Sequence, residues 1–154
     1  MEARVALAAR AWLIPPAART AVNPVPATPE VVEAGLAHWA DHCATCHAND
    51  GSGDTALGRS LYPPAPDMRG GRTQGMTDGE LFYIIEQGVP LTGMPAWSTG
   101  TDDGATASWE LVRFIRHLPS LTSDDLSRMA ALNPRSAAQI ENERRLQDFL
   151  KGGR

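Results

Sequence analysis

Lysine is almost absent from this 154-residue chain, because Lys151 is the only lysine among 14 basic residues. The formal net charge is −4, and no segment gathers the arginines into a dominant cluster, which argues against nucleic acid as a partner. No apolar run approaches the roughly 18 residues that a membrane-spanning helix needs. Cysteine is also scarce, with two residues in the whole chain. What remains is a length that suits one domain with extensions.

The two cysteines lie close together, in the sequence Cys43-Ala44-Thr45-Cys46-His47. This spacing is the attachment signature of c-type haem. Two thiols about one helical turn apart add to the two vinyl groups of one porphyrin edge. The histidine after the second cysteine offers a ring nitrogen to the iron as the proximal ligand. We therefore predict one haem c, bound covalently through Cys43 and Cys46 and ligated by His47.

Two other interpretations of this motif are weaker. A structural zinc site uses four ligands, usually as two separated pairs, and no second cysteine/histidine pair follows in the chain. His38 and His42 share a helix face, but two solvated polar residues account for that spacing more simply. A thioredoxin-like redox pair needs a strand–helix–strand setting, whereas here a helix precedes the motif and a glycine-rich loop follows it.

Capping signals predict an all-α chain. Thr28 followed by Pro29 begins one helix, Thr77-x-x-Glu80 forms a capping box, and Thr122 and Ser136 begin two more helices. The helices are expected over residues 29–46, 77–88, 104–118, 122–132 and 136–150. Residues 48–75 are expected to be a long loop, and five prolines in residues 15–29 predict an extended arm without regular helix. Residues 1–13 are expected to form a short amphipathic helix, with Trp12 on its apolar side.

The second iron ligand is expected from a loop later in the chain. Met94 follows the flexible Gly93 and precedes Pro95, which fixes the backbone beside it. It lies far enough from His47 for a helix to intervene, so we predict these two as the axial pair. His38 and His42 precede the attachment site on the same helix and cannot easily reach across the ring. The other weaker candidates are Met68, Met76, Met129 and His117.

A histidine–methionine pair has a functional meaning. The soft thioether favours ferrous iron and raises the reduction potential. Two strong axial ligands leave no open position for a substrate or for oxygen. The sequence therefore predicts an electron-transfer protein and not an enzyme.

Taken in order, these features resemble the class I cytochrome c family. Gly35 and Trp39 stand eight and four residues before Cys43, and the haem-attachment pentapeptide, a Gly/Pro-rich loop and a middle helix follow. The Met94 loop and a further amphipathic helix complete the pattern. The resemblance covers about residues 28–121 and implies an all-α class I cytochrome c fold wrapped around one haem.

The resemblance also implies particular contacts. Gly35 and Trp39 would pack across the last helix of the domain, near Leu111 and Phe114. A proline carbonyl within residues 63–66 would accept the second N–H of the proximal histidine and fix its ring. Trp97 and Tyr62 are expected either to line the haem crevice or to pack in the core. Arg59, Arg69 and Arg72 are expected either to neutralise the propionates or, more simply, to be solvated. The sequence also departs from the family, with Ala48 where a glycine often follows the haem histidine and without the lysine ring of mitochondrial cytochrome c.

We expect three segments: a proline-rich arm (1–27), the cytochrome c domain (28–121) and a helical extension (122–154). The expected function is one-electron transfer as a periplasmic or otherwise extracytoplasmic carrier between redox partner proteins that the sequence does not identify. Two alternatives remain open, a fixed haem subunit of a larger oxidoreductase and a haem-based redox or gas sensor. Because haem c is attached outside the cytoplasm, we expect a leader or membrane anchor to precede residue 1. The arm would then be a spacer to that anchor, a wrap on the domain, or both.

Overall fold

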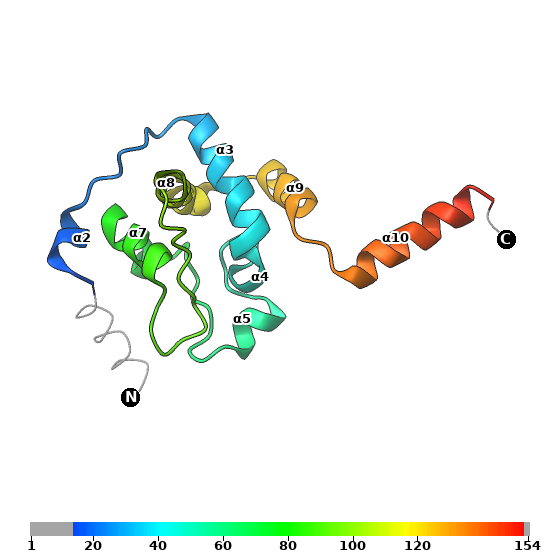
Figure 1. The fold of residues 1–154 in the computed structure, drawn as a ribbon, viewed down its shortest axis with the longest axis horizontal. Helices are drawn as coiled ribbons and strands as arrows, with labels where there is room; N and C mark the ends of the chain where they lie inside the picture. The colour runs from blue at the N-terminus through cyan, green and yellow to red at the C-terminus, as the bar shows by residue number, and fades with distance from the viewer. Residues whose placement is uncertain (1–13, 153–154) are drawn as a thin grey trace.

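The computed structural model describes residues 14–152, and the helix expected over residues 1–13, with Trp12, lies outside them. The predicted all-α fold is confirmed, because the described residues form helices and no strand. Figure 1 shows α3, α7 and α8 gathered into one body. In chain order the helices are α2 (Pro16–Thr20), α3 (Pro29–His38), the π-helix η1 (Trp39–Cys43), α4 (Ala44–His47), α5 (Ala56–Ser60), α6 (Gly71–Gln74), α7 (Asp78–Gln87), α8 (Asp102–His117), the 3-10 helix η2 (Leu118–Ser120), α9 (Ser123–Leu132) and α10 (Ala137–Leu150).

The predicted caps begin four of these helices. The Thr28 side chain accepts from the backbone N–H of Val31 at the start of α3, and α7, α9 and α10 begin with complete capping boxes. Helix α8 begins two residues earlier than expected. The reason is Thr101, whose hydroxyl accepts from the backbone N–H of Gly104 at 3.1 Å and so caps the helix before Asp102.

The central contact of the fold is the crossing of α3 and α8. A Cβ added at Gly35 would lie 2.4 Å from the carbonyl oxygen of Glu110 and 2.8 Å from the Phe114 Cβ, so the two helices approach more closely than a side chain at this position would allow. Trp39 is 1% exposed, and its ring centroid lies 5.6 Å from that of Phe114. The contact between Gly35, Trp39 and α8 that the resemblance implied is therefore present.

The expectation that residues 15–29 contain no helix is wrong. Pro15 and Pro16 stand at the N-cap and first position of α2, where a missing N–H costs nothing and the fixed φ suits a helix start. The loop expected over residues 48–75 is likewise interrupted by α5 and α6. Thr55 caps α5 by accepting from the backbone N–H of Gly58 at 2.8 Å.

The arm over residues 14–27 wraps on the domain. Ile14 is 4% exposed and belongs to the hydrophobic core. The Asn23 side chain donates to the Trp109 carbonyl at 3.0 Å, and the Arg113 guanidinium donates to the Val25 carbonyl at 2.9 Å from Nε. Residues 23 and 25 thus fasten the arm to α8, and Ile14 fastens it to the core, in agreement with the second of the two roles expected for the arm.

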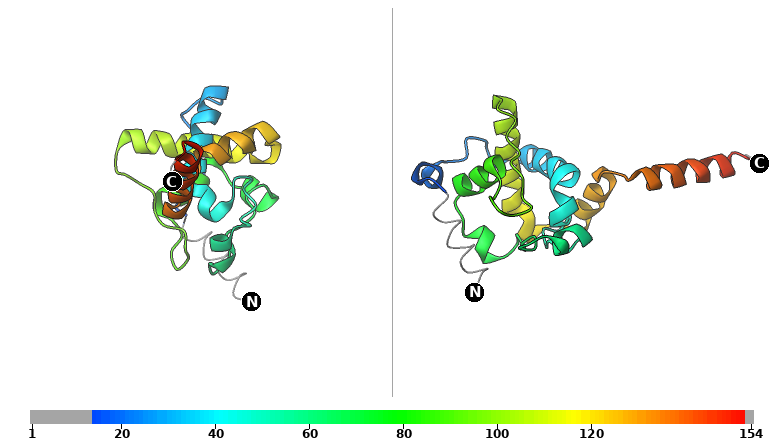
Figure 2. Two further views of the ribbon diagram at one scale, coloured as in Figure 1. Left: turned by 90° about the vertical axis from the view of Figure 1, so that its right-hand side faces the viewer. Right: turned by 60° about the horizontal axis from the view of Figure 1, so that its bottom comes forward.

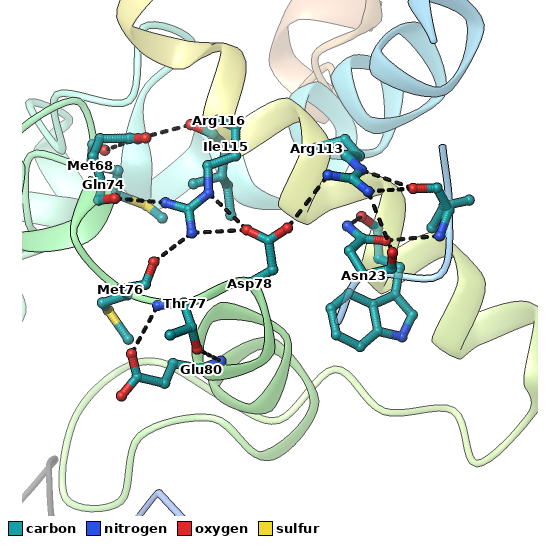
Figure 3. A network of polar contacts seen from close by, with 12 residues as sticks. Asn23, Met68, Gln74, Met76, Thr77, Asp78, Glu80, Arg113, Ile115 and Arg116 are labelled. Carbon is teal, nitrogen blue, oxygen red and sulfur yellow. Dashed lines mark hydrogen bonds and ion pairs between the residues drawn. The ribbon is translucent and has the colours of Figure 1, made fainter. Parts of the chain in front are cut away.

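A network of polar contacts joins the arm, the start of α7 and α8 (Figure 3). Asp78 accepts from Arg116 Nε at 2.9 Å with one carboxylate oxygen, and its other oxygen lies 3.4 Å from Arg113 Nη1. Arg116 also donates to the carbonyls of Gln74 and Met76, the former at 2.9 Å. One guanidinium therefore satisfies the carbonyls at the end of α6 and the carboxylate that opens α7.

The two helices after residue 121 have different surroundings. Helix α9 packs on the domain, because Met129 is fully buried in the core and the Asn133 side chain donates to the Ala40 carbonyl at 2.8 Å. The backbone N–H of Thr122, at 2.9 Å, is the main reason why the pKa of Asp125 falls to about 2. Helix α10 extends away from the rest of the chain, as Figures 1 and 2 show. None of the helices in residues 14–152 has the length and apolarity to cross a membrane.

Candidate haem-binding site

The attachment motif lies at the end of the helix that begins at Pro29. The chain passes without interruption from α3 through η1 into α4, so Cys43 ends the π-helical segment and Cys46 and His47 end α4. Trp39 anchors this segment twice, through its ring against Phe114 and through Nε1, which donates to the Ala48 carbonyl at 3.0 Å. The motif is therefore fixed to the same helix crossing that organises the core.

The loop after the motif folds back tightly on it. The backbone N–H of Gly53 donates to the His47 carbonyl at 2.8 Å, and the Thr55 hydroxyl donates to the carbonyls of Thr45 at 2.9 Å and Cys46 at 3.3 Å. A Cβ at Gly58 would lie 2.3 Å from the Cys46 carbonyl oxygen. Thr55 is a positioning residue that the sequence analysis missed, although a threonine before Ala56 is an N-cap signal that could have drawn attention to it.

Both cysteines are free thiols in the structure. Burial is the main cause that raises the pKa of Cys43 to about 12, with the neighbouring Cys46 adding to it. A reactive redox pair needs an accessible thiolate with a lowered pKa. Cys43 therefore lacks the lowered pKa of a reactive redox thiol, whereas two unpaired thiols three positions apart fit thioether attachment.

His47 contains an unsatisfied polar atom. Among the described residues, its Nδ1 is the one buried side-chain nitrogen or oxygen without a hydrogen-bond partner. The proline carbonyl within residues 63–66 that was expected to accept from this histidine makes no such bond, so that expectation is wrong for this structure. Burial lowers the pKa of His47 below its usual range, which favours the neutral imidazole that metals bind. A half-buried imidazole with a buried Nδ1, beside two free thiols, fits a c-type haem.

Ala48 adopts a backbone conformation that glycine adopts more easily. Its φ is +62° and its ψ is 160°, a region that is essentially restricted to glycine. Its N–H donates to the Ala44 carbonyl at 2.8 Å, and its carbonyl accepts from Trp39 and from Gly51. This is the position at which the family often has glycine. The three hydrogen bonds hold the strained turn that leads the chain away from His47.

The structure separates the candidate methionines by their surroundings. Met76 and Met129 are 8% and 0% exposed and are members of the hydrophobic core, and Met68 packs against that core. Met94 is half-buried and does not belong to the core cluster of the described residues. The interpretation of Met94 as an ordinary core methionine therefore loses its support, while that interpretation does hold for Met76 and Met129.

The Met94 loop is closed by its own hydrogen bonds. The Met94 N–H donates to the Thr92 hydroxyl at 3.1 Å, and its carbonyl accepts from the Val89 N–H at 3.0 Å. The Trp97 N–H donates to the Ile85 carbonyl at 3.0 Å and ties the end of the loop to α7. A Cβ at Gly93 would lie 2.5 Å from Leu61 Cδ2, so the loop also packs closely on the segment after α5.

The remaining candidates are two aromatic residues and three loop arginines. Trp97 is half-buried, packs against the core, and its ring centroid lies 5.4 Å from that of His42 on the attachment helix. Tyr62 is 72% exposed, so core packing does not describe it. The loop arginines pair with neighbouring carboxylates, Arg59 with Asp54 and Arg69 with Asp50 and Asp67, and Arg72 is exposed.

The all-helical fold and a site with two free thiols and a half-buried histidine define a c-type cytochrome domain. A family model described as cytochrome c oxidase, cbb3-type, subunit III, matches residues 30–115. The chain therefore belongs to this family. Membership implies a covalent c-type haem, and Cys43 and Cys46 are the two cysteines of the chain that can hold it.

Two curated proteins illustrate the relationship. The cbb3-type cytochrome c oxidase subunit FixP of Sinorhizobium medicae (strain WSM419) is 32% identical over 94 residues, which are 60% of this chain and 29% of that protein. The protein of the same name from Rhizobium meliloti (strain 1021) is 33% identical over 73 residues, 47% of this chain and 23% of that protein. The matched part of the chain thus spans less than a third of either relative.

Proposed function

We propose that this chain is the electron-transfer part of a haem subunit in an oxidase complex, with His47 and Met94 as the axial ligands of one haem c. The observation that carries the site is the contrast between the core methionines and Met94, together with the buried, unpartnered Nδ1 of His47. The family match supports the fixed haem subunit, the second of the functions expected from the sequence, better than the free carrier.

The residues of the chain have separate tasks in this proposal. When bound, a haem with histidine and methionine ligands accepts and releases one electron without opening a site for substrate. The hydrogen bonds of Thr55 and Gly53 hold the attachment segment, and those of Thr92 and Val89 hold the Met94 backbone. A framework fixed on both sides keeps the ligand geometry nearly constant when the iron changes charge, which suits rapid electron transfer.

The proposal also concerns the location and the partners. The relatives named as oxidase subunits support a fixed donor and acceptor within one complex. Because haem c is attached outside the cytoplasm, we place the domain on the periplasmic side of the membrane. A tether to that membrane before residue 1 stays part of the proposal.

Replacing Met94 with alanine tests the ligand set. The sulfur-to-iron charge-transfer band of the ferric protein is expected to disappear, and the reduction potential to fall on the order of 0.1 V, within the ~0.8 V that axial ligands span. The reduced variant should also bind carbon monoxide. Absorption spectra and a redox titration of the purified holoprotein measure these effects.

Met68→Leu is the matched control, because Met68 packs against the core. Its spectrum and potential should equal those of the wild type. Retention of the band in Met94→Ala would assign the sixth ligand elsewhere. Ready binding of carbon monoxide by the wild-type protein would instead favour the gas sensor.

The place in a complex needs a second experiment. An affinity tag on this chain, used on detergent-solubilised membranes of its host, should recover oxygen-reducing activity together with the haem-stained band. Recovery of the haem protein alone from the soluble fraction would support the free carrier.

A further inference from the structure

We infer that Leu91 is the apolar contact through which the Met94 loop docks on a redox-partner protein with an uncharged face. This inference rests on the proposed function, because Leu91 derives its relevance from lying three residues before the proposed iron ligand. It adds a partner surface and the chemistry of the partner to that site.

The backbone at Leu91 is unfavourable for leucine. The Thr92 N–H donates to the Val89 carbonyl at 3.2 Å, which closes a turn with Pro90 and Leu91 at its centre. The φ of Leu91 is +63°. A positive φ after a proline at this place in a turn is the position at which glycine or asparagine is preferred. Leucine therefore stands where the local structure favours a different residue.

The side chain of Leu91 gains nothing from burial that would offset this strain. It is 102% exposed, more than any of the other large hydrophobic residues among those described. A single exposed leucine is ordinary on a protein surface. Leu91 therefore stabilises the fold neither by burying its side chain nor by its backbone conformation. Backbone strain of this kind is found preferentially at functional positions.

The two chain segments that meet beside the Met94 loop carry no charge, and the exposed carboxylates Asp102 and Asp103 directly follow the first of them. Residues 88–101 and 60–66 contain no acidic or basic side chain, and the two segments touch where Gly93 lies on Leu61. We call these two segments the uncharged rim. The charged residues that border the second segment are paired, Arg59 with Asp54 and Asp67 with Arg69. The net charge of −4 therefore arises outside the rim.

The lack of charge on the rim favours a partner whose contacting face is also uncharged. A charged partner face would lose water on docking and find no counter-charge on the rim, which is costly. An uncharged apolar face around another redox centre would bury Leu91 without removing any charge from water. The uncharged rim is itself such a face, so a second copy of this protein serves as the probe.

Electron self-exchange between reduced and oxidised copies of the holoprotein, measured by NMR line broadening, tests the inference. Leu91→Gly is expected to slow the exchange roughly tenfold, as loss of one central apolar contact does. The same substitution should raise Tm by about 2–4 °C, because glycine relieves the positive φ. The ratio of the two rates should not change between low and high salt, since an apolar contact is not screened.

Three further variants separate the explanations. Leu91→Met keeps an apolar side chain and should exchange as the wild type does, whereas Leu91→Asn tolerates the turn and should be slow. Val22→Ser, which removes an 84% exposed aliphatic side chain from the arm, is the matched control and should leave the rate unchanged.

Equal rates for the wild type and Leu91→Gly, with the sulfur-to-iron band present in both, would overturn the inference and leave the proposed function intact. A rate ratio that varies with salt would also overturn it. Absence of the band from the wild type would instead refute the proposed ligand set.

Discussion

Alanine in place of Gly35 is expected to lower the free energy of unfolding of the holoprotein by about 2 kcal/mol or more. In an exposed helix the same change would raise stability by up to about 1 kcal/mol, because alanine is the better helix former. Here the new methyl group would meet the Glu110 carbonyl at 2.4 Å and the Phe114 Cβ at 2.8 Å. Both are on α8 and one is backbone, so the helices must separate.

The chain supplies a matched control for this result. Gly71 is also helical, in α6, and a Cβ added there would meet no atom within 4 Å. Gly71→Ala should therefore leave stability unchanged or raise it slightly. Denaturant unfolding of both variants beside the wild type measures the difference, and equal effects of the two substitutions would show that α3 and α8 do not approach as closely as described.

Removing the Arg116 side chain is expected to cost about 2–3 kcal/mol. The side chains of Arg116 and Asp78 are 27% and 24% exposed, so solvent screens the pair and the cost lies below that of a fully buried one. The loss is still large because the carbonyls of Gln74 and Met76 lose their donor at the same time (Figure 3). Thermal or denaturant unfolding of Arg116→Ala measures it.

Two control variants, Arg144→Ala and Arg116→Lys, show whether the loss depends on burial and on the shape of the guanidinium. Arg144→Ala removes a 69% exposed arginine that pairs with Glu141 on its own helix, and it should change stability by less than about 0.5 kcal/mol. Arg116→Lys keeps the charge but cannot reach three acceptors at once, so it should recover only a small part of the loss. Full recovery by lysine would mean that charge alone matters at this position.

Local signals in the sequence predict much of this fold. Helices α3, α7, α9 and α10 begin where Thr28, Thr77, Thr122 and Ser136 indicate, because a cap satisfies backbone groups only a few residues away. Helix α2 is missed because its prolines lie at the start, where they are compatible with a helix. The Asp78–Arg116 pair joins residues 38 positions apart, and nothing local marks it.

The residues of the candidate site also divide into those that the sequence predicts and those that it does not. Cys43, Cys46 and His47 are recognisable because covalent chemistry fixes their spacing, and the family match supports the cofactor that they imply. Met94 stays a prediction, strengthened by the burial of Met76 and Met129. The support that Thr55 gives to the motif, and the missing partner of His47 Nδ1, depend on how distant loop segments meet, which the residue pattern does not contain.

The π-helical segment η1 lies between α3 and α4 in one continuous helix over residues 29–47, with Gly35 before it and Cys46 after it. A π-helical turn holds more residues than an α-helical turn, so it changes the angular phase of everything that follows. The thiols therefore point in a different direction from the one that an uninterrupted α-helix would give them relative to the face of α3 that crosses α8. The widened turn acts as a rotational offset between the part of the helix that builds the core and the part that presents the cysteines.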